Sequence, residues 1–152
     1  MHTPAHDPIP TATPGRTGAG HTGPEAASTE PARTGHNLRL GATGESIAAE
    51  YLVARGFVPV AHNWRCRYGE LDLVMRDGGA YVAVEVKTRS GTGYGSPLEA
   101  ITARKAARLR RLLLEWSAQT GNRGGELRVD AVGITLRPGA ESPSITYLRA
   151  IA

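Results

Sequence analysis

The sequence predicts an α/β domain in which a mixed β-sheet is flanked by helices, with elements in the order α-β-β-β-α-β-β. Two segments repeat small and apolar residues every three or four positions, as amphipathic helices do. Five shorter runs are rich in valine and aromatic residues, as strands are, and a two-glycine turn joins two of them. Helices could cover both faces of such a sheet or only one.

Residues 1–37 precede this pattern and are predicted to be a disordered tail. They contain six of the ten prolines and, apart from Ile9, none of the larger aliphatic or aromatic residues. Such a segment cannot bury enough apolar surface to offset the entropy lost on ordering. The predicted domain organisation is therefore a Pro/Gly/Thr-rich tail over 1–37 and one folded domain over 38–152.

The first half of the domain is predicted to be a helix followed by three strands. Apolar and small residues recur at helical spacing from Leu40 to Arg55, and Gly56 is a typical helix stop. Strands are expected over 57–64, 70–75 and 80–88. Asp77-Gly78-Gly79 lies between the second and third runs and indicates a tight β-hairpin.

The second half begins with a glycine-rich loop over 89–96. Ser96-Pro97-Leu98-Glu99 resembles a capping box, which predicts a helix from Ser96 to about Thr120. The expected buried stripe of this helix is Leu109, Leu112, Leu113 and Trp116, with arginines on another face. Two last strands are predicted over 127–136 and 145–148.

Composition excludes several classes of protein. Cys66 is the only cysteine, so neither an internal disulfide nor a cysteine metal cluster can form. No apolar run approaches the roughly 20 residues of a membrane-spanning helix, which predicts a soluble, cytoplasmic protein without a membrane partner. The tail carries a net charge of −1 and the domain +5, which gives weak support for a nucleic-acid partner.

The hairpin brings ionisable residues together. If Gly78-Gly79 forms the two-residue turn, Asp72 lies directly opposite Glu85, with Cβ atoms about 4.5–5.5 Å apart. Alternation along the strand places Lys87 on the same face as Glu85. Two like-charged carboxylates at this distance are tolerated when a cation or a proton lies between them.

Magnesium is the cation that this donor set predicts, with manganese as the alternative. It is held by one or two carboxylates together with waters and phosphate oxygens, and no histidine or cysteine cluster favours a softer metal. Lys87 could then orient a water or stabilise charge on a phosphoryl oxygen. The equally weighted alternative is that Lys87 forms an ordinary surface ion pair with Asp72 or Glu85.

Other charged and aromatic residues are weaker candidates when taken alone. Glu45 could lean toward the hairpin as a further ligand, or it could simply favour the N-terminal end of its helix. Candidate contacts to nucleic acid lie in the glycine-rich loop and the second helix. These candidates are Arg89, Tyr94, Arg104, Lys105 and Arg108.

Several segments together carry a family resemblance: Gly41-Ala42-Thr43-Gly44-Glu45, Asn63, Gly69-Glu70-Leu71-Asp72-Leu73, Val84-Glu85-Val86-Lys87-Thr88-Arg89 and Lys105. Over roughly residues 38–148 the chain resembles the bacterial YraN-like family. Members of that family are classed with endonucleases of the restriction-endonuclease-like PD-(D/E)xK superfamily, related to archaeal Holliday-junction resolvases.

The resemblance implies a restriction-endonuclease-like fold and a role for each site residue. Asp72 and Glu85 would bind the metal, Lys87 would be the catalytic lysine, and Glu45 would be the helix carboxylate of the resolvase branch. Leu71 replaces the proline of the nominal motif, and the role of Glu70 stays open.

The first functional hypothesis is a Mg²⁺- or Mn²⁺-dependent endonuclease acting on DNA, with branched or recombination intermediates as the implied substrates. A resolvase-like enzyme is expected to be a homodimer, because symmetric cutting of two strands suits a two-fold axis. The second hypothesis is a nucleic-acid-binding module without turnover, whose binding to DNA would survive EDTA. A third hypothesis, ranked last, is an interaction protein that recruits partners through its tail.

Overall fold

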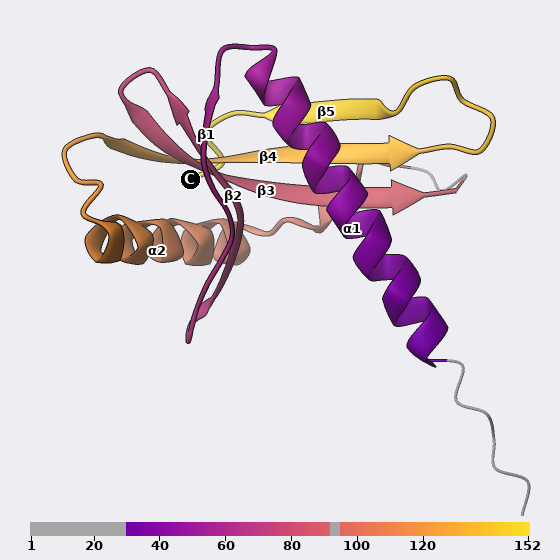
Figure 1. Cartoon of the computed structure of the whole chain (residues 1–152), viewed down its shortest axis with the longest axis horizontal. Coiled ribbons are helices and arrows are strands. Elements are labelled where there is room, and N and C mark those ends of the chain that lie inside the picture. Colours follow the sequence, from indigo (N-terminus) through magenta and orange to yellow (C-terminus); the bar gives the residue numbers. More distant parts are fainter. Residues whose placement is uncertain (1–29, 92–94) are drawn as a thin grey trace, which may run out of the picture.

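The computed structural model describes residues 30–91 and 95–152, in which a five-stranded sheet lies between two helices (Figure 1). The elements, in chain order, are α1 (Glu30–Val53), β1 (Val58–Cys66), β2 (Gly69–Asp77), β3 (Ala80–Ser90), the 3₁₀ helix η1 (Pro97–Ala100), α2 (Ala103–Thr120), β4 (Glu126–Leu136) and β5 (Ser144–Leu148). The predicted α/β class is confirmed, and helices cover both faces of the sheet.

The strands lie in the spatial order β1-β2-β3-β4-β5. All neighbouring pairs are antiparallel except β3 and β4, which are parallel, so the sheet is mixed as predicted. Helix α2 provides the crossover between those two parallel strands. In Figure 1 the β1–β2 ribbon runs steeply across the direction of β3, β4 and β5.

The first helix begins at Glu30, ten residues before the predicted start at Leu40. It therefore takes in residues 30–37, which the sequence assigned to the tail. Those residues have no large apolar side chains, so they carry no helical periodicity that could reveal the extension. The rest of the predicted tail, residues 1–29, lies outside the described residues.

The predicted second helix is interrupted. Ser96 caps η1 rather than α2, and its hydroxyl accepts the N–H of Leu98 at 3.2 Å. Ile101 is extended, and α2 starts afresh with Thr102, whose hydroxyl accepts the N–H of Lys105 at 3.1 Å. A capping sequence fixes where a helical turn begins but not how long it lasts, which explains the error.

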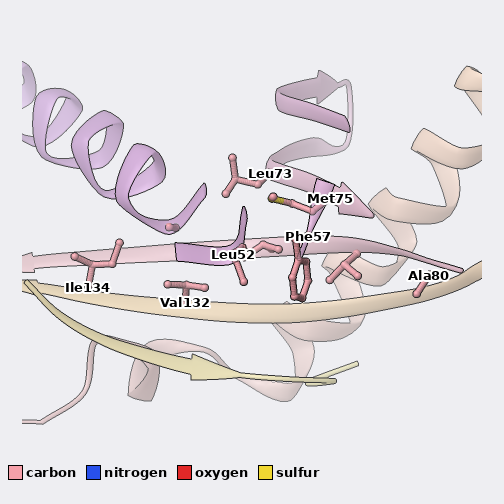
Figure 2. Packing of buried hydrophobic residues seen from close by; sticks show 10 residues of the cluster. Leu52, Phe57, Leu73, Met75, Ala80, Val132 and Ile134 are labelled. Carbon is pink, nitrogen blue, oxygen red and sulfur yellow. The ribbon is translucent and has the colours of Figure 1, made fainter. Parts of the chain in front are cut away.

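Two apolar cores hold the helices to the sheet. The core under α1 includes Leu52, Phe57, Leu73 and Met75 (Figure 2). The core under α2 contains the predicted stripe of Leu109, Leu112, Leu113 and Trp116. All four stripe residues are at most 4% exposed, which confirms that prediction.

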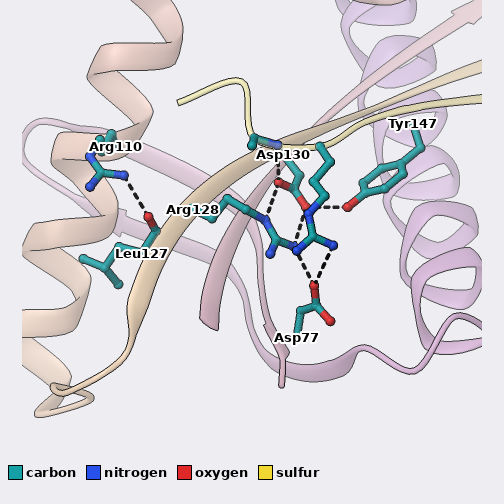
Figure 3. Close-up of polar contacts among 8 residues, drawn as sticks. Asp77, Arg110, Leu127, Arg128, Asp130 and Tyr147 are labelled. Atoms are coloured by element: carbon teal, nitrogen blue, oxygen red, sulfur yellow. Dashed lines mark hydrogen bonds and ion pairs between the residues drawn. The ribbon is translucent and has the colours of Figure 1, made fainter. Parts of the chain in front are cut away.

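A buried charge network joins β4 to the C-terminal segment (Figure 3). Asp130 is fully buried, and its carboxylate accepts hydrogen bonds from the Arg128 guanidinium, the Tyr147 hydroxyl and the N–H of Ala150. Arg128 also donates to Asp77 Oδ2 at 2.8 Å. This set of residues is called the closed cluster below.

Neither of the two long helices within the described residues is apolar enough over a sufficient length to cross a membrane.

Candidate active site

The predicted hairpin register is confirmed where the strands pair. Partners run from Asp77 opposite Ala80 to Leu73 opposite Val84, as the two-glycine turn requires. At the next position the contact between the strands is made by a side chain. Asp72 Oδ2 accepts a hydrogen bond from the N–H of Val86 at 3.0 Å. Asp72 is thereby fixed beside the part of β3 that carries Glu85.

Leu71 departs from the predicted alternation. Regular alternation along β2 would place Leu71 on the same face as Leu73 and Met75, but Leu71 packs in the core under α2. Beyond Leu73, β2 pairs only with β1, as far as Gly69 opposite Cys66. A two-stranded ribbon twists more strongly than a wide sheet, and the strand end turns with it.

Asp72 and Glu85 line one groove of about 340 Å³ with both lysines of the chain. Its lining residues are Glu70, Asp72, Glu85, Lys87, Lys105, Arg108, Leu109 and Leu112. The structure thus brings together the predicted acids, the predicted lysine and two of the residues predicted to contact nucleic acid. This set is called the open cluster below.

Both lysines approach the same oxygen of Glu85. Lys105 Nζ lies 2.8 Å from Glu85 Oε1, and Lys87 Nζ lies 3.6 Å from it. The Glu85 side chain is only 7% exposed, whereas the two lysine side chains are 35% and 38% exposed. A nearly buried carboxylate is therefore matched by two cations that still face solvent.

Asp72 is an unusually weak acid for a carboxyl group. Burial raises its pKa to about 7, helped by the negative charge of Glu85, and the hydrogen bond from Val86 only partly offsets this. A proton or a metal cation would equally relieve the charge. For Lys105, burial lowers the pKa, but the contact with Glu85 outweighs it, and the net pKa is raised.

Glu45 reaches this groove only indirectly. It lines a separate hollow of about 370 Å³ on the α1 side, together with His62 and Asn63. With its amide nitrogen turned toward the acids, Asn63 donates to Glu45 Oε2 at 3.1 Å and to Glu70 Oε1 at 3.2 Å. Burial raises the pKa of Glu45, and the Asn63 hydrogen bond opposes this. Asn63 and Glu70 thus link Glu45 to the groove.

Local backbone features support this link. Asn63 has φ 49°, a left-handed conformation that asparagine tolerates better than most residues. Gly44 lets α1 lie directly against β3, because a Cβ there would overlap the Thr88 hydroxyl. Sequence reasoning gave Asn63 no role and left that of Glu70 open. The available signal was the alternation that puts Glu70 on the face of Asp72.

Of the described candidates for nucleic-acid contact, Lys105 and Arg108 line the groove, whereas Arg89 and Arg104 do not. Arg104 and Arg108 are exposed on α2. Arg108 Nη2 donates to the carbonyl of Tyr68 at 2.9 Å. Arg89, at the end of β3, donates to the carbonyl of Gly95 at 3.4 Å. Tyr94 lies outside the described residues.

The donor set suits a hard divalent cation such as Mg²⁺ or Mn²⁺. No group of three or more His, Cys, Asp or Glu side chains that could hold a metal occurs within residues 39–91 and 95–152. Asp72 and Glu85 provide two carboxylates, and Mg²⁺ commonly uses one or two, with waters and substrate phosphates in its other positions. A softer metal would need nitrogen or sulfur ligands that the groove does not supply.

Fold and groove together define an α/β protein with an acid–lysine site beside a β-hairpin. Residues 44–134 match the model of a family described as Uncharacterised protein family UPF0102, and the chain belongs to this family. That segment contains Glu45, Asp72, Glu85, Lys87 and Lys105. Membership in the YraN-like group is thereby confirmed.

Three curated relatives, each named a UPF0102 protein, illustrate the similarity. The chain is 47% identical to the protein of Nocardia farcinica over 126 residues, 83% of this chain and 98% of the relative. It is 52% identical to that of Clavibacter michiganensis over 110 residues, 72% of this chain and 92% of the relative. It is 53% identical to that of Leifsonia xyli over 112 residues, 74% and 94% respectively.

Proposed function

We propose that the protein is a metal-dependent endonuclease that hydrolyses DNA phosphodiester bonds. The observation that carries the proposal is the convergence of Asp72, Glu85, Lys87 and Lys105 in one groove. Two acids alone would repel a phosphate, and two lysines alone would only bind one. Acids and ammonium groups together suit a site that holds a divalent cation and a phosphodiester at once.

Each residue has a definite task in this proposal. Asp72 and Glu85 would hold Mg²⁺ or Mn²⁺, which supplies a Lewis acid and a water of lowered pKa. Lys87 faces the groove from the strand position after Val86 and can stabilise charge on a phosphoryl oxygen. Lys105 remains protonated, because its net pKa is raised, and it neutralises Glu85 or a neighbouring phosphate.

DNA is the proposed substrate, and branched intermediates are the proposed substrate class. The choice of DNA rests on the basic residues that line the groove. The choice of branched intermediates rests on the resemblance to resolvases. A restriction-endonuclease-like fold and a homodimer belong to the same proposal. Asn63 would serve as a positioning residue, since it joins Glu45 to Glu70 at the groove wall.

A nucleic-acid-binding module without turnover is the second candidate. It is favoured by the contact of 2.8 Å between Lys105 and Glu85, because the protein already neutralises the acid with its own cation. In that case no metal would be needed for binding. Binding to DNA would be unchanged or tighter with EDTA.

The test compares labelled four-way junction, flap, single-stranded and duplex DNA, with Mg²⁺ or Mn²⁺ and with EDTA. We expect metal-dependent cutting that Glu85→Gln reduces by at least about 100-fold, the size of effect seen when a group that stabilises the transition state is removed. Glu126→Gln, at the exposed start of β4, is the matched control and should retain activity. No cutting by the unmodified protein, with junction binding that survives EDTA, would establish the second candidate.

A further inference from the structure

We propose that the β1–β2 turn and the exposed side of α2 form a second binding surface, on which Tyr68 stacks with an unpaired base of a DNA strand. The inference rests on the proposed function, and it names the part of the substrate that the acid–lysine groove does not contact. It concerns Tyr68, Arg67 and Arg111, none of which belongs to the open cluster.

The surface is a groove that continues the first one. It has a volume of about 540 Å³ and is lined by Tyr68, Arg108, Arg111, Leu112 and Glu115. Arg108 and Leu112 also line the groove of Asp72 and Glu85. A strand whose phosphate lies at the acids can therefore follow α2 to Tyr68.

The turn that carries Tyr68 is held firmly against α2. Arg108 Nη2 donates to the Tyr68 carbonyl at 2.9 Å. The next residue, Gly69, has φ 150°, and a Cβ there would lie 3.1 Å from both Arg108 Nη2 and Leu112 Cδ1. This φ is one that residues with a side chain rarely adopt, and the Arg108 hydrogen bond fastens the turn to α2, so Tyr68 is placed beside the acid–lysine groove.

The Tyr68 ring is available to a ligand. It is 54% exposed, although it is large and aromatic. The Arg67 guanidinium lies 4.6 Å from the ring centroid and also donates to the Tyr68 hydroxyl, which orients the ring. A fixed, exposed aromatic ring beside arginines is the usual platform for bases of single-stranded nucleic acid.

The charges around Tyr68 favour a phosphate backbone. The positive charges near Tyr68 are those of Arg67, Arg108 and Arg111, and the negative charge is that of Glu115. Arg65 contributes less, because it lies 3.2 Å from Glu70. Stacking also needs a base with a free face, which the interior of a duplex does not offer. The structure therefore favours substrates with unpaired nucleotides next to the cleavage site, such as single strands, flaps and open junctions.

The test measures equilibrium binding of labelled single-stranded and blunt duplex DNA of equal length in EDTA, so that no cutting occurs. We expect Tyr68→Leu to weaken single-strand binding by about 10-fold, because stacking on one ring changes affinity by roughly 5- to 150-fold. Tyr68→Phe keeps the ring and should stay within about 2-fold. Duplex binding should change little in either variant.

Leu114→Ala is the matched control, since Leu114 is 51% exposed on α2 and lines neither groove. It should bind both DNAs as the unmodified protein does. Thermal unfolding of each variant verifies that the fold is intact. Equal single-strand binding by Tyr68→Leu and the unmodified protein would overturn the inference, as would an equal loss for single-stranded and duplex DNA.

Failure of this surface can be told apart from failure of the nuclease. If the unmodified protein cuts DNA with Mg²⁺ but Tyr68→Leu binds single strands normally, the second surface is wrong and the nuclease stands. If nothing is cut but Tyr68→Leu selectively loses single-strand binding, the second surface stands and the hydrolytic function is wrong.

Discussion

Strand β2 carries one aspartate into each of two charged clusters, and the two clusters are built differently. Asp77 faces the closed cluster, where Arg128 and Arg149 approach it. Asp72 faces the open cluster, five residues earlier on the same strand, beside a second carboxylate. In the closed cluster each carboxylate faces an arginine, whereas in the open cluster both lysines approach Glu85 and Asp72 lies beside that second carboxylate.

The pKa values of residues in the two clusters show the difference most directly. In the closed cluster the contact with Asp130 raises the pKa of Arg128 further, and burial together with Asp130 raises that of Tyr147 to about 12. Both groups thus keep the protonation state that their hydrogen bonds need. In the open cluster Asp72 is held near a pKa of about 7 by burial and Glu85, which destabilises its charged form. A cluster that destabilises its own charge is suited to an external cation.

The largest expected effect comes from breaking the closed cluster. Asp130→Ala would leave Arg128 buried without its main partner and remove the acceptor for Tyr147 and for the N–H of Ala150. We expect the free energy of unfolding to fall by about 3–5 kcal/mol, measured by urea denaturation. Glu141→Ala, in the exposed turn before β5, is the control and should change it by less than about 0.5 kcal/mol. A loss below about 1 kcal/mol for Asp130→Ala would show that the network contributes little.

The second largest effect is expected from Mg²⁺, which should stabilise the protein through the open cluster and not through the closed one. If it binds Asp72 and Glu85, it should raise the free energy of unfolding by about 2.7 kcal/mol at a hundred times its Kd. The gain should vanish in Asp72→Asn and persist in Asp77→Asn, the same change on the same strand. Urea denaturation in MgCl₂ and in EDTA measures it. An equal gain in both variants would place the ion elsewhere.

The same two variants should shift stability in opposite directions without metal. A carboxyl with a raised folded pKa contributes stability below its unfolded pKa of about 3.8 and loses it as the pH rises toward 7. Asp72→Asn removes this loss, so in EDTA at pH 8 we expect it to be more stable than the unmodified protein by about 1 kcal/mol. Asp77→Asn should be less stable, because it weakens the pair with Arg128.

The pH series checks the cause of that gain. Urea denaturation between pH 4 and pH 8 should show the advantage of Asp72→Asn growing with pH. An advantage that is constant with pH would mean that the ionisation of Asp72 is not responsible.

The smallest effect is expected at the rim of the open cluster. Arg65 pairs with Glu70 at 3.2 Å, but its side chain is 75% exposed. Arg65→Ala should change the free energy of unfolding by less than about 0.5 kcal/mol in urea denaturation, since solvent screens such pairs. A change above about 1 kcal/mol would mean that the rim is as tightly organised as the closed cluster.

Local signals were enough to predict the hairpin part of the site. The two-glycine turn set the register, and the register set Asp72 beside Glu85. The stripe of α2 was equally clear, because a helix that covers a sheet repeats its apolar residues at a fixed spacing. These features depend on neighbours in sequence or on a single regular period.

The parts that depend on distant packing were not predictable. Lys105 was a weak candidate because only the crossover through α2 brings it to Glu85. The indirect position of Glu45 depends on the left-handed backbone at Asn63. The closed cluster was missed altogether, since Arg128 and Asp130 stand in a valine-rich strand and their other partners come from β5, the C-terminal segment and β2.

The hydrogen bond between Val86 and Asp72 has a practical consequence. At this point the carboxylate proposed to hold the metal is itself an acceptor for the backbone of β3. Any change in the charge on that carboxylate must alter the shielding of one amide proton. The Val86 resonance in a ¹⁵N-correlated NMR spectrum is therefore a built-in reporter, which can follow cation loading in solution without substrate and without turnover.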